Sequence, residues 1–227
     1  MLLVLWDVDH TLIESGGVGG AVFKDAFRQV TGRELTASGQ VQGALEPELF
    51  AAGCAANGVA GDPAGLFGAF AAVQADLYRQ RAGLLRGHGR VLPGVAGLLE
   101  RLDADPGVVS TVLSGNTAGA GVAKLEAFGV AGLLDLEIAA WGTDAPNRAG
   151  LAPVAWARAG AKYGARFGPA TTLTVGDTPA DVAAAAANDV RCLAVATGRF
   201  GVDDLAGAWR VVEDLTGAAA VIAAFPG

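Results

Sequence analysis

The 227-residue sequence contains very little lysine: only Lys24, Lys124 and Lys162. Arginine supplies the rest of the 16 basic residues, which face 23 acidic ones, so the net charge is −7 at pH 7. The basic residues form no run along the chain. Binding to a phosphate backbone depends on clustered lysine and arginine, so we expect no nucleic-acid partner.

Cysteine and long apolar runs are also scarce. Two cysteines, Cys54 and Cys192, cannot build a disulfide framework, which indicates a reducing compartment. The mean hydropathy of +0.41 owes much to alanine, and no stretch approaches the roughly 20 apolar residues of a spanning helix. The apolar run Met1–Trp6 leads straight into Asp7 without a basic region or cleavage pattern, so we expect no signal peptide. The composition favours a soluble, cytoplasmic protein with no membrane partner.

Short apolar runs that alternate with helical patterns predict an α/β fold. Runs of this kind are typical of strands buried on both faces of a parallel sheet. They occur at Leu2–Trp6, Val108–Leu113, Thr171–Val175 and Val190–Val195, with weaker ones at Leu133–Ile138 and Trp209–Val212. Helical patterns occupy Val95–Leu102, Gly119–Phe128, Ala152–Tyr163, Ala180–Ala187 and Thr216–Phe225. The alternation predicts a Rossmann-like parallel sheet with right-handed crossovers.

The segment between the first two predicted strands interrupts this alternation. It shows helix-like stretches and no buried strand: Ala21–Val30, Glu46–Ala56 and Ala64–Arg81. We therefore predict a catalytic core of residues 1–15 and 90–227 and an inserted all-helical cap of residues 16–89.

Polar residues follow three of the predicted strands. Asp7 and Asp9 follow the first, Ser114-Gly115-Asn116 the second, and Asp177 and Asp181 the strand Thr171–Val175. The carboxyl ends of parallel strands lie at one edge of a sheet, where such folds bind ligands. The spacing Asp-x-Asp turns both side chains to the same side of an extended segment, so one can act as nucleophile while the other protonates the leaving oxygen.

The four aspartates predict a metal ion at this edge. Carboxylates brought together raise one another's pKa unless a cation is present. Oxygen ligands without histidine or cysteine favour a hard ion, Mg²⁺ before Zn²⁺. Such an ion would keep Asp7 ionised and offset the charge of an incoming phosphate. Ser114 adds a hydroxyl, and Gly115 and Asn116 add backbone N–H groups at the start of a helix, which together suit an anion.

These motifs resemble those of the haloacid dehalogenase-like hydrolases, close to the phosphoglycolate phosphatase branch. The resemblance rests on Asp7-Val8-Asp9-His10-Thr11-Leu12, Ser114-Gly115-Asn116 and Gly176-Asp177-x-x-x-Asp181, in this order and each at a strand end. It extends to Leu92-Pro93-Gly94-Val95, to the segment Lys124–Gly129 and to Val195-Ala196-Thr197-Gly198. It covers nearly all of the core, whereas the cap matches only in its placement and helical character.

The resemblance implies a role for each motif residue. Asp7 would attack phosphorus and form an aspartyl-phosphate, and Asp9 would act first as general acid and then as base. Mg²⁺ would bind the Asp7 side chain, the Asp9 carbonyl and Asp177, with support from Asp181. Thr11, Ser114, Gly115 and Asn116 would bind the substrate and its phosphoryl group. The cap would close over a small phosphorylated metabolite, in a monomer or a homodimer.

The family also uses a cation, usually lysine, ahead of its last motif. Here the aligned residue is Arg148, in the loop before Ala152–Tyr163. Lys162 is the competitor, but it lies near the far end of that helix. An arginine supplies the same charge together with a bidentate fork, so we assign Arg148 to catalysis and to phosphate binding.

Each motif also has a purely structural interpretation. Asp7 and Asp9 could stabilise a turn, Ser114 could cap the helix after it, Asp177 and Asp181 could cap another, and Arg148 could lie on the surface. The combination favours chemistry.

Among enzymes, the second aspartate, Asp9, disfavours a dehalogenase, which needs no protonated leaving oxygen. A phosphonate-cleaving enzyme would need a cap lysine for a Schiff base, and Lys24 is the cap's only one. We predict a Mg²⁺-dependent phosphatase. The alternatives are a phosphomutase of the β-phosphoglucomutase type and a non-catalytic binding protein on the same scaffold.

Overall fold

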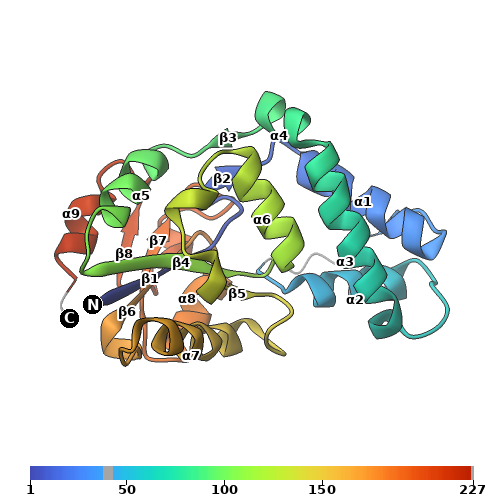
Figure 1. The fold of residues 1–227 in the computed structure, drawn as a ribbon. Helices are drawn as coiled ribbons and strands as arrows, with labels where there is room; N and C mark the ends of the chain where they lie inside the picture. Colours follow the sequence, from blue (N-terminus) through green and yellow to red (C-terminus); the bar gives the residue numbers. More distant parts are fainter. Residues whose placement is uncertain (38–42, 226–227) are drawn as a thin grey trace.

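A six-stranded parallel sheet forms the centre of the molecule in the computed structural model, which describes residues 1–37 and 43–225 (Figure 1). The strand order is β5-β4-β1-β6-β7-β8. The first strand, β1 (Leu2–Trp6), is central and pairs with β4 (Val108–Ser114) and β6 (Thr172–Gly176). The outer strands are β5 (Ala140–Trp141), β7 (Arg191–Val195) and β8 (Arg210–Val212). The α/β fold predicted from the apolar runs is confirmed.

Helices cover both faces of the sheet because its strands are apolar on both sides. Val4 and Trp6 of β1 pack on one face, against α5 (Val95–Asp103), α6 (Ala118–Ala127) and α9 (Ala218–Ala223). Leu3 and Leu5 pack on the other, against α7 (Leu151–Tyr163). Helix α8 (Pro179–Ala186) covers β7 on that second face. The alternation of side chains along β1 thus joins two apolar layers through one strand.

One predicted strand is wrong. Residues 133–138 do not extend; they form two short 3₁₀ turns, Ala131–Leu133 and Leu136–Ile138. The Asp135 carboxylate accepts a hydrogen bond from the backbone N–H of Glu137 at 3.3 Å, which stabilises the second turn. The edge strand follows at β5, so the apolar residues of this segment fill the core without pairing in the sheet.

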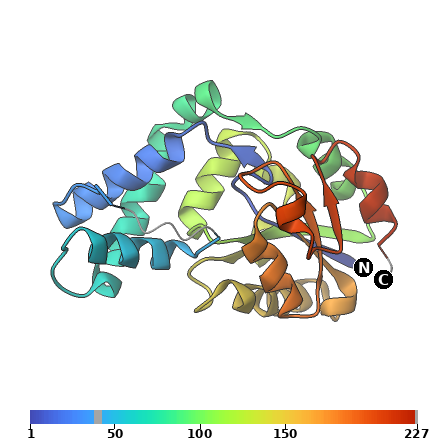
Figure 2. The same ribbon diagram turned by 180° about the vertical axis from the view of Figure 1, so that it is seen from behind.

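Of the helices described between β1 and β4, four extend to one side of the sheet (Figures 1 and 2), whereas α5 covers its face. These four are α1 (Val18–Thr31), α2 (Glu46–Ala56), α3 (Pro63–Gln80) and α4 (Ala82–His88). The chain enters and leaves them through a two-stranded antiparallel ribbon of β2 (Ile13–Glu14) and β3 (Arg90–Val91). We call α1–α4 the cap helices.

Aromatic side chains hold the cap helices together and fix them to the core. Phe50 lies 4.6 Å from Phe70 and 5.8 Å from Phe27, measured between ring centroids. The same apolar cluster includes Ala120 and Ala123 of α6. Helix α6 therefore packs against the sheet and against the cap helices at once.

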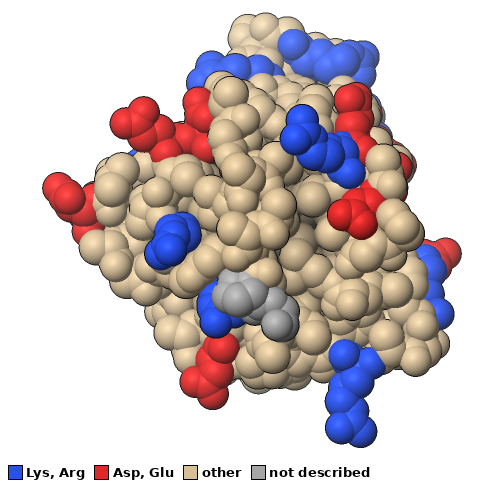
Figure 3. Space-filling view, turned by 90° about the vertical axis from the view of Figure 1, so that its left-hand side faces the viewer, with Lys and Arg blue, Asp and Glu red and all other residues tan. Residues whose placement is uncertain are grey.

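The surface remote from the cap helices carries charges of both signs. Figure 3 shows this end of the molecule, near α9 and the termini, where acidic and basic side chains form small separate groups between uncharged areas. Within the described residues, no helix has the length and apolar character needed to cross a membrane.

Candidate active site

The loop after β1 turns Asp7 and Asp9 toward the same side. Between them Val8 is fully buried, and its carbonyl accepts hydrogen bonds from the backbone N–H groups of Leu12 and Ile13. His10 takes a left-handed conformation, φ 61°, which closes this turn. The alternation predicted for the Asp-x-Asp spacing follows from the burial of the apolar residue between the carboxylates.

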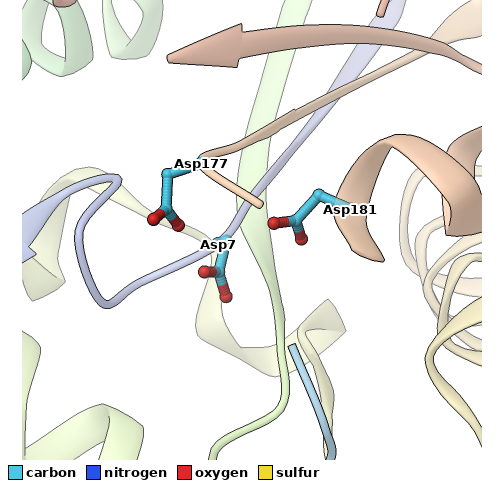
Figure 4. A group of neighbouring side chains, drawn as sticks. All are labelled: Asp7, Asp177 and Asp181. Atoms are coloured by element: carbon cyan, nitrogen blue, oxygen red, sulfur yellow. The ribbon is translucent and has the colours of Figure 1, made fainter. Parts of the chain in front are cut away.

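Three aspartates from two strand ends meet beside this loop. Oxygen atoms of Asp7, Asp177 and Asp181 all lie within 4.8 Å of one another (Figure 4). Asp177 follows β6, and Asp181 lies in the first turn of α8, where it accepts hydrogen bonds from the N–H and hydroxyl of Thr178 at 3.0 and 2.6 Å. Gly176 makes this approach feasible, since a Cβ there would lie 2.3 Å from Asp181 Cγ.

The three buried carboxyls are costly to ionise together. Burial raises the pKa of Asp7 to about 6, with a further rise from Asp181 and Asp9 against the opposing effect of Arg148. Burial and the charges of Asp7 and Asp181 raise the pKa of Asp177 to about 8. A hard divalent cation relieves such crowding and prefers carboxylate oxygens, so these residues fit Mg²⁺.

Arg148 bridges two of the three carboxylates. Its Nη2 lies 3.1 Å from Asp7 Oδ1, and its Nε donates to Asp181 Oδ1 at 2.8 Å. A 3₁₀ turn, Arg148–Gly150, positions it, and the Asn147 side chain caps this turn by accepting from the N–H of Gly150. Lys162 lies elsewhere, in surface ion pairs with Asp135 and Glu137. The structure thus brings the arginine to the carboxylates, and the lysine competitor stays away.

The segment after β4 lies against Asp7 and Asp9. Ser114 is buried, and its hydroxyl accepts from Asn116 Nδ2 at 2.9 Å; the same amide donates to Asp9 Oδ2 at 2.8 Å. Thr117 caps α6 by accepting from the N–H of Ala120. Ser114 is therefore not the cap of this helix, and its hydroxyl offsets a small part of the rise in the pKa of Asp7.

Thr11 lies next to Asp177, one of the three clustered aspartates. Its side chain is fully buried, and its hydroxyl donates to Asp177 Oδ1 at 3.4 Å. The resemblance implied a contact of Thr11 with substrate; in the structure its hydroxyl contacts Asp177.

Lys124 is a site residue that the sequence analysis missed. Its Nζ lies 2.7 and 3.0 Å from the two carboxylate oxygens of Asp9 and 2.7 Å from Asn116 Oδ1. Burial alone would lower the pKa of Lys124, but the charge of Asp9, together with Tyr78 and Glu46, opposes burial and the net pKa is raised. Burial would in turn raise the pKa of Asp9, but Lys124 and Asn116 together oppose it and the net pKa is lowered. As a result, Asp9 directs its carboxylate at Lys124 and does not join the cluster of Asp7, Asp177 and Asp181.

These groups line a cavity of about 510 Å³ between the sheet edge and the cap helices. The core contributes Asp7, Asp9, Ser114, Arg148 and Asp177 to its lining; the cap helices contribute Phe23, Lys24, Glu46 and Tyr78. This volume suits a small organic molecule held over Asp7.

Comparison with known proteins shows the family of the chain. The haloacid dehalogenase-like hydrolase family model matches residues 1–189, most of the chain. The chain belongs to this family of hydrolases. It is therefore an enzyme, as the sequence analysis predicted. No curated protein sequence matches it significantly.

Solved haloacid dehalogenase-like structures share the fold at low sequence identity. CbbY from Rhodobacter sphaeroides, in complex with phosphate, is 18% identical with a TM-score of 0.69, over 96% of both chains. A predicted phosphoglycolate phosphatase from Haemophilus somnus 129PT is 19% identical with a TM-score of 0.69, over 98% of both chains. A provisionally assigned β-phosphoglucomutase from Thermotoga maritima is 14% identical with a TM-score of 0.61, over 98% of this chain and 99% of the other.

Proposed function

We propose that the protein is a Mg²⁺-dependent phosphatase that hydrolyses a small phosphomonoester through an aspartyl-phosphate on Asp7. The observation that best supports this proposal is the position of Asp7, which lines the cavity next to Arg148 and Ser114. A nucleophile needs a group that holds it ionised and donors that receive the transferred phosphoryl group, and both are adjacent here.

In the first step, an Asp7 oxygen attacks phosphorus while the bond between phosphorus and the leaving oxygen breaks. Asp9, in the protonated state that the second step regenerates, gives its proton to that oxygen, and Arg148 balances part of the negative charge on phosphate and nucleophile. Ser114, with the N–H groups of Gly115 and Asn116, binds the phosphoryl oxygens. In the second step, Asp9 takes a proton from the water that attacks phosphorus, and phosphate leaves Asp7.

The residues that would hold Mg²⁺ are Asp7, Asp177 and the Asp9 carbonyl, with Asp181 in support. When bound there, Mg²⁺ supplies positive charge that lowers the repulsion between the phosphate and the Asp7 carboxylate. Asp181 also accepts a hydrogen bond from Arg148 and so holds the guanidinium group beside the same carboxylates.

We infer that residues 16–89 act as the cap and that residues 1–15 and 90–227 form the catalytic core. The Glu46 N–H, at the start of α2, donates to the Gly115 carbonyl at 2.9 Å, so the cap meets the phosphate-binding segment directly. The two buried free cysteines, Cys54 and Cys192, fit action in the reducing cytoplasm.

The test is a phosphate-release screen of small phosphomonoesters with and without Mg²⁺. It includes β-glucose 1-phosphate scored for isomerisation, which would reveal a phosphomutase, and a phosphonate, because Lys24 lines the cavity. We expect Asp7→Asn to abolish phosphate release and to leave the circular dichroism spectrum unchanged. The control is Asp76→Asn, a change at an exposed aspartate of α3, which should retain activity. Full activity of Asp7→Asn would refute the aspartyl-phosphate mechanism.

A further inference from the structure

We propose that Lys124 is a positioning residue: it fixes the Asp9 carboxylate for proton transfer to the leaving oxygen. The proposal rests on the proposed function, in which Asp9 protonates that oxygen. Lys124 meets both Asp9 oxygens, at 3.0 and 2.7 Å, so rotation of this carboxylate breaks an ion pair. Asn116 donates to Asp9 Oδ2 as well and accepts from Lys124, so two side chains that contact each other fix one carboxylate orientation.

The difference in exposure assigns an indirect role to Lys124. Both side chains line the cavity, but that of Lys124 is 5% exposed, whereas that of Asp9 is 33% exposed. A substrate therefore has more access to the Asp9 carboxylate than to the ammonium group. Lys124 acts on the reaction through the carboxylate that it holds.

The apolar packing of α6 gives no reason for a charge at Lys124. Its helix, α6, buries Ala120, Ala123, Leu125 and Ala127, and an apolar side chain would satisfy this packing. Burying an ammonium group costs several kcal/mol, which only a well-placed partner offsets, and replacing a buried ion pair by apolar groups is often neutral or stabilising. The retained lysine is accounted for by the carboxylate it orients.

The cap helices hold the ammonium group from the other side. The Tyr78 ring of α3 has its centroid 4.9 Å from Lys124 Nζ, a cation–π contact. Nearby, Glu46 accepts from the Thr117 N–H at 2.8 Å and from the Gln74 side chain. Glu46, Asp9 and Tyr78 are thus the charged and titratable groups that act on Lys124, and they come from both the cap and the core.

Leaving-group chemistry separates a role in proton transfer from a structural role. An alkoxide leaves only with a proton, whereas p-nitrophenolate leaves without one, so only an alkyl phosphate needs Asp9 in the first step. The ratio kcat/KM reports the steps up to departure of the leaving group. The assay compares p-nitrophenyl phosphate with the alkyl phosphate that the screen above finds to be hydrolysed fastest.

We expect Lys124→Met to lower kcat/KM for the alkyl phosphate about 100-fold, the scale of general acid catalysis, and for p-nitrophenyl phosphate less than about threefold. Lys124→Gln, which can still donate a hydrogen bond to Asp9, should recover part of the loss and serves if the methionine variant does not fold. Asp9→Asn should show the same selectivity as Lys124→Met, and the double variant should add little to either, because both changes remove one function.

Thr117→Val is the matched control. It removes the side-chain cap of the same helix and the hydroxyl contact with Gln74 of the cap helices without touching Asp9, so any loss should be equal for the two substrates. Equal losses for Lys124→Met, beside a selective loss for Asp9→Asn, would overturn the proposal and leave the proposed function standing. An equal loss for Asp9→Asn would instead refute the proton-transfer role of Asp9 and, with it, the positioning role of Lys124.

Discussion

Replacing Arg148 by methionine is the perturbation whose effect on stability the structure predicts most directly. The Arg148 side chain is 10% exposed and contacts Asp7 and Asp181, which are 11% and 5% exposed. Methionine keeps much of the volume and removes the charge. The variant therefore leaves two almost buried carboxylates without their cation, next to Asp177.

Removal of one partner of a buried ion pair costs about 3–5 kcal/mol, because the other charge stays buried and uncompensated. A domain of this size loses about 2–4 °C of melting temperature per kcal/mol. We therefore expect Arg148→Met to lower the melting temperature by roughly 6–20 °C without Mg²⁺. A smaller drop is expected in saturating Mg²⁺, since a divalent cation compensates the same carboxylates.

The assay is calorimetric unfolding with and without Mg²⁺, combined with phosphate release. Lys162→Met is the control, because it removes an equal charge from surface ion pairs, which water screens and which contribute little to stability. Turnover should fall strongly in Arg148→Met and stay near the parent value in Lys162→Met. The electrostatic account of the cluster is wrong if Arg148→Met and Lys162→Met have the same melting temperature. It is also wrong if Mg²⁺ does not reduce the difference in melting temperature between Arg148→Met and the parent protein.

Two further predictions concern the loop at Gly115 and the metal. A Cβ at Gly142 would lie 2.0 Å from the Gly115 carbonyl oxygen, so Gly142→Ala should shift the phosphate-binding segment and lower the rate of phosphate release. Gly132 has open space around it, so Gly132→Ala is the control and should keep the parent rate in the same assay. Chelation of divalent metal should abolish turnover, and saturating Mg²⁺ should raise the melting temperature of the parent protein but not of Asp177→Asn. An unchanged Asp177→Asn response would contradict the assigned ligand.

The fold was predictable because its signals are local. Leu2–Trp6 and the corresponding runs are apolar on both faces, a pattern that only a covered parallel sheet explains well. The exception, residues 133–138, contains equally apolar positions. Periodicity alone does not separate a short strand from 3₁₀ turns, and the Asp135 side chain decides between them by bonding to the backbone of Glu137.

The site was predictable where topology brings motif residues together. Asp7, Asp177 and Asp181 follow strands that end at one edge of the sheet, so their proximity follows from the strand order. Lys124 follows no strand. One signal could have found it: Lys124 lies four residues after Ala120 and seven after Thr117, on the α6 face that is otherwise small and buried. Its pairing with Asp9 spans 115 residues and has no counterpart in local sequence.

Arg148 and Lys124, which contact the aspartates of the site, suit different geometries, which explains why one is an arginine and the other a lysine. Arg148 reaches Asp7 through Nη2 and Asp181 through Nε, and a planar guanidinium can bridge two carboxylates in this way because its donors point in fixed, separate directions. Lys124 contacts the carboxylate of Asp9, the carbonyl of the Asn116 side chain and the ring face of Tyr78, which lie around a single nitrogen atom. A compact ammonium group with three donors fits that arrangement, and the planar guanidinium group of an arginine does not. In a chain with three lysines, the one that is buried thus lies where a lysine has a geometric advantage over arginine.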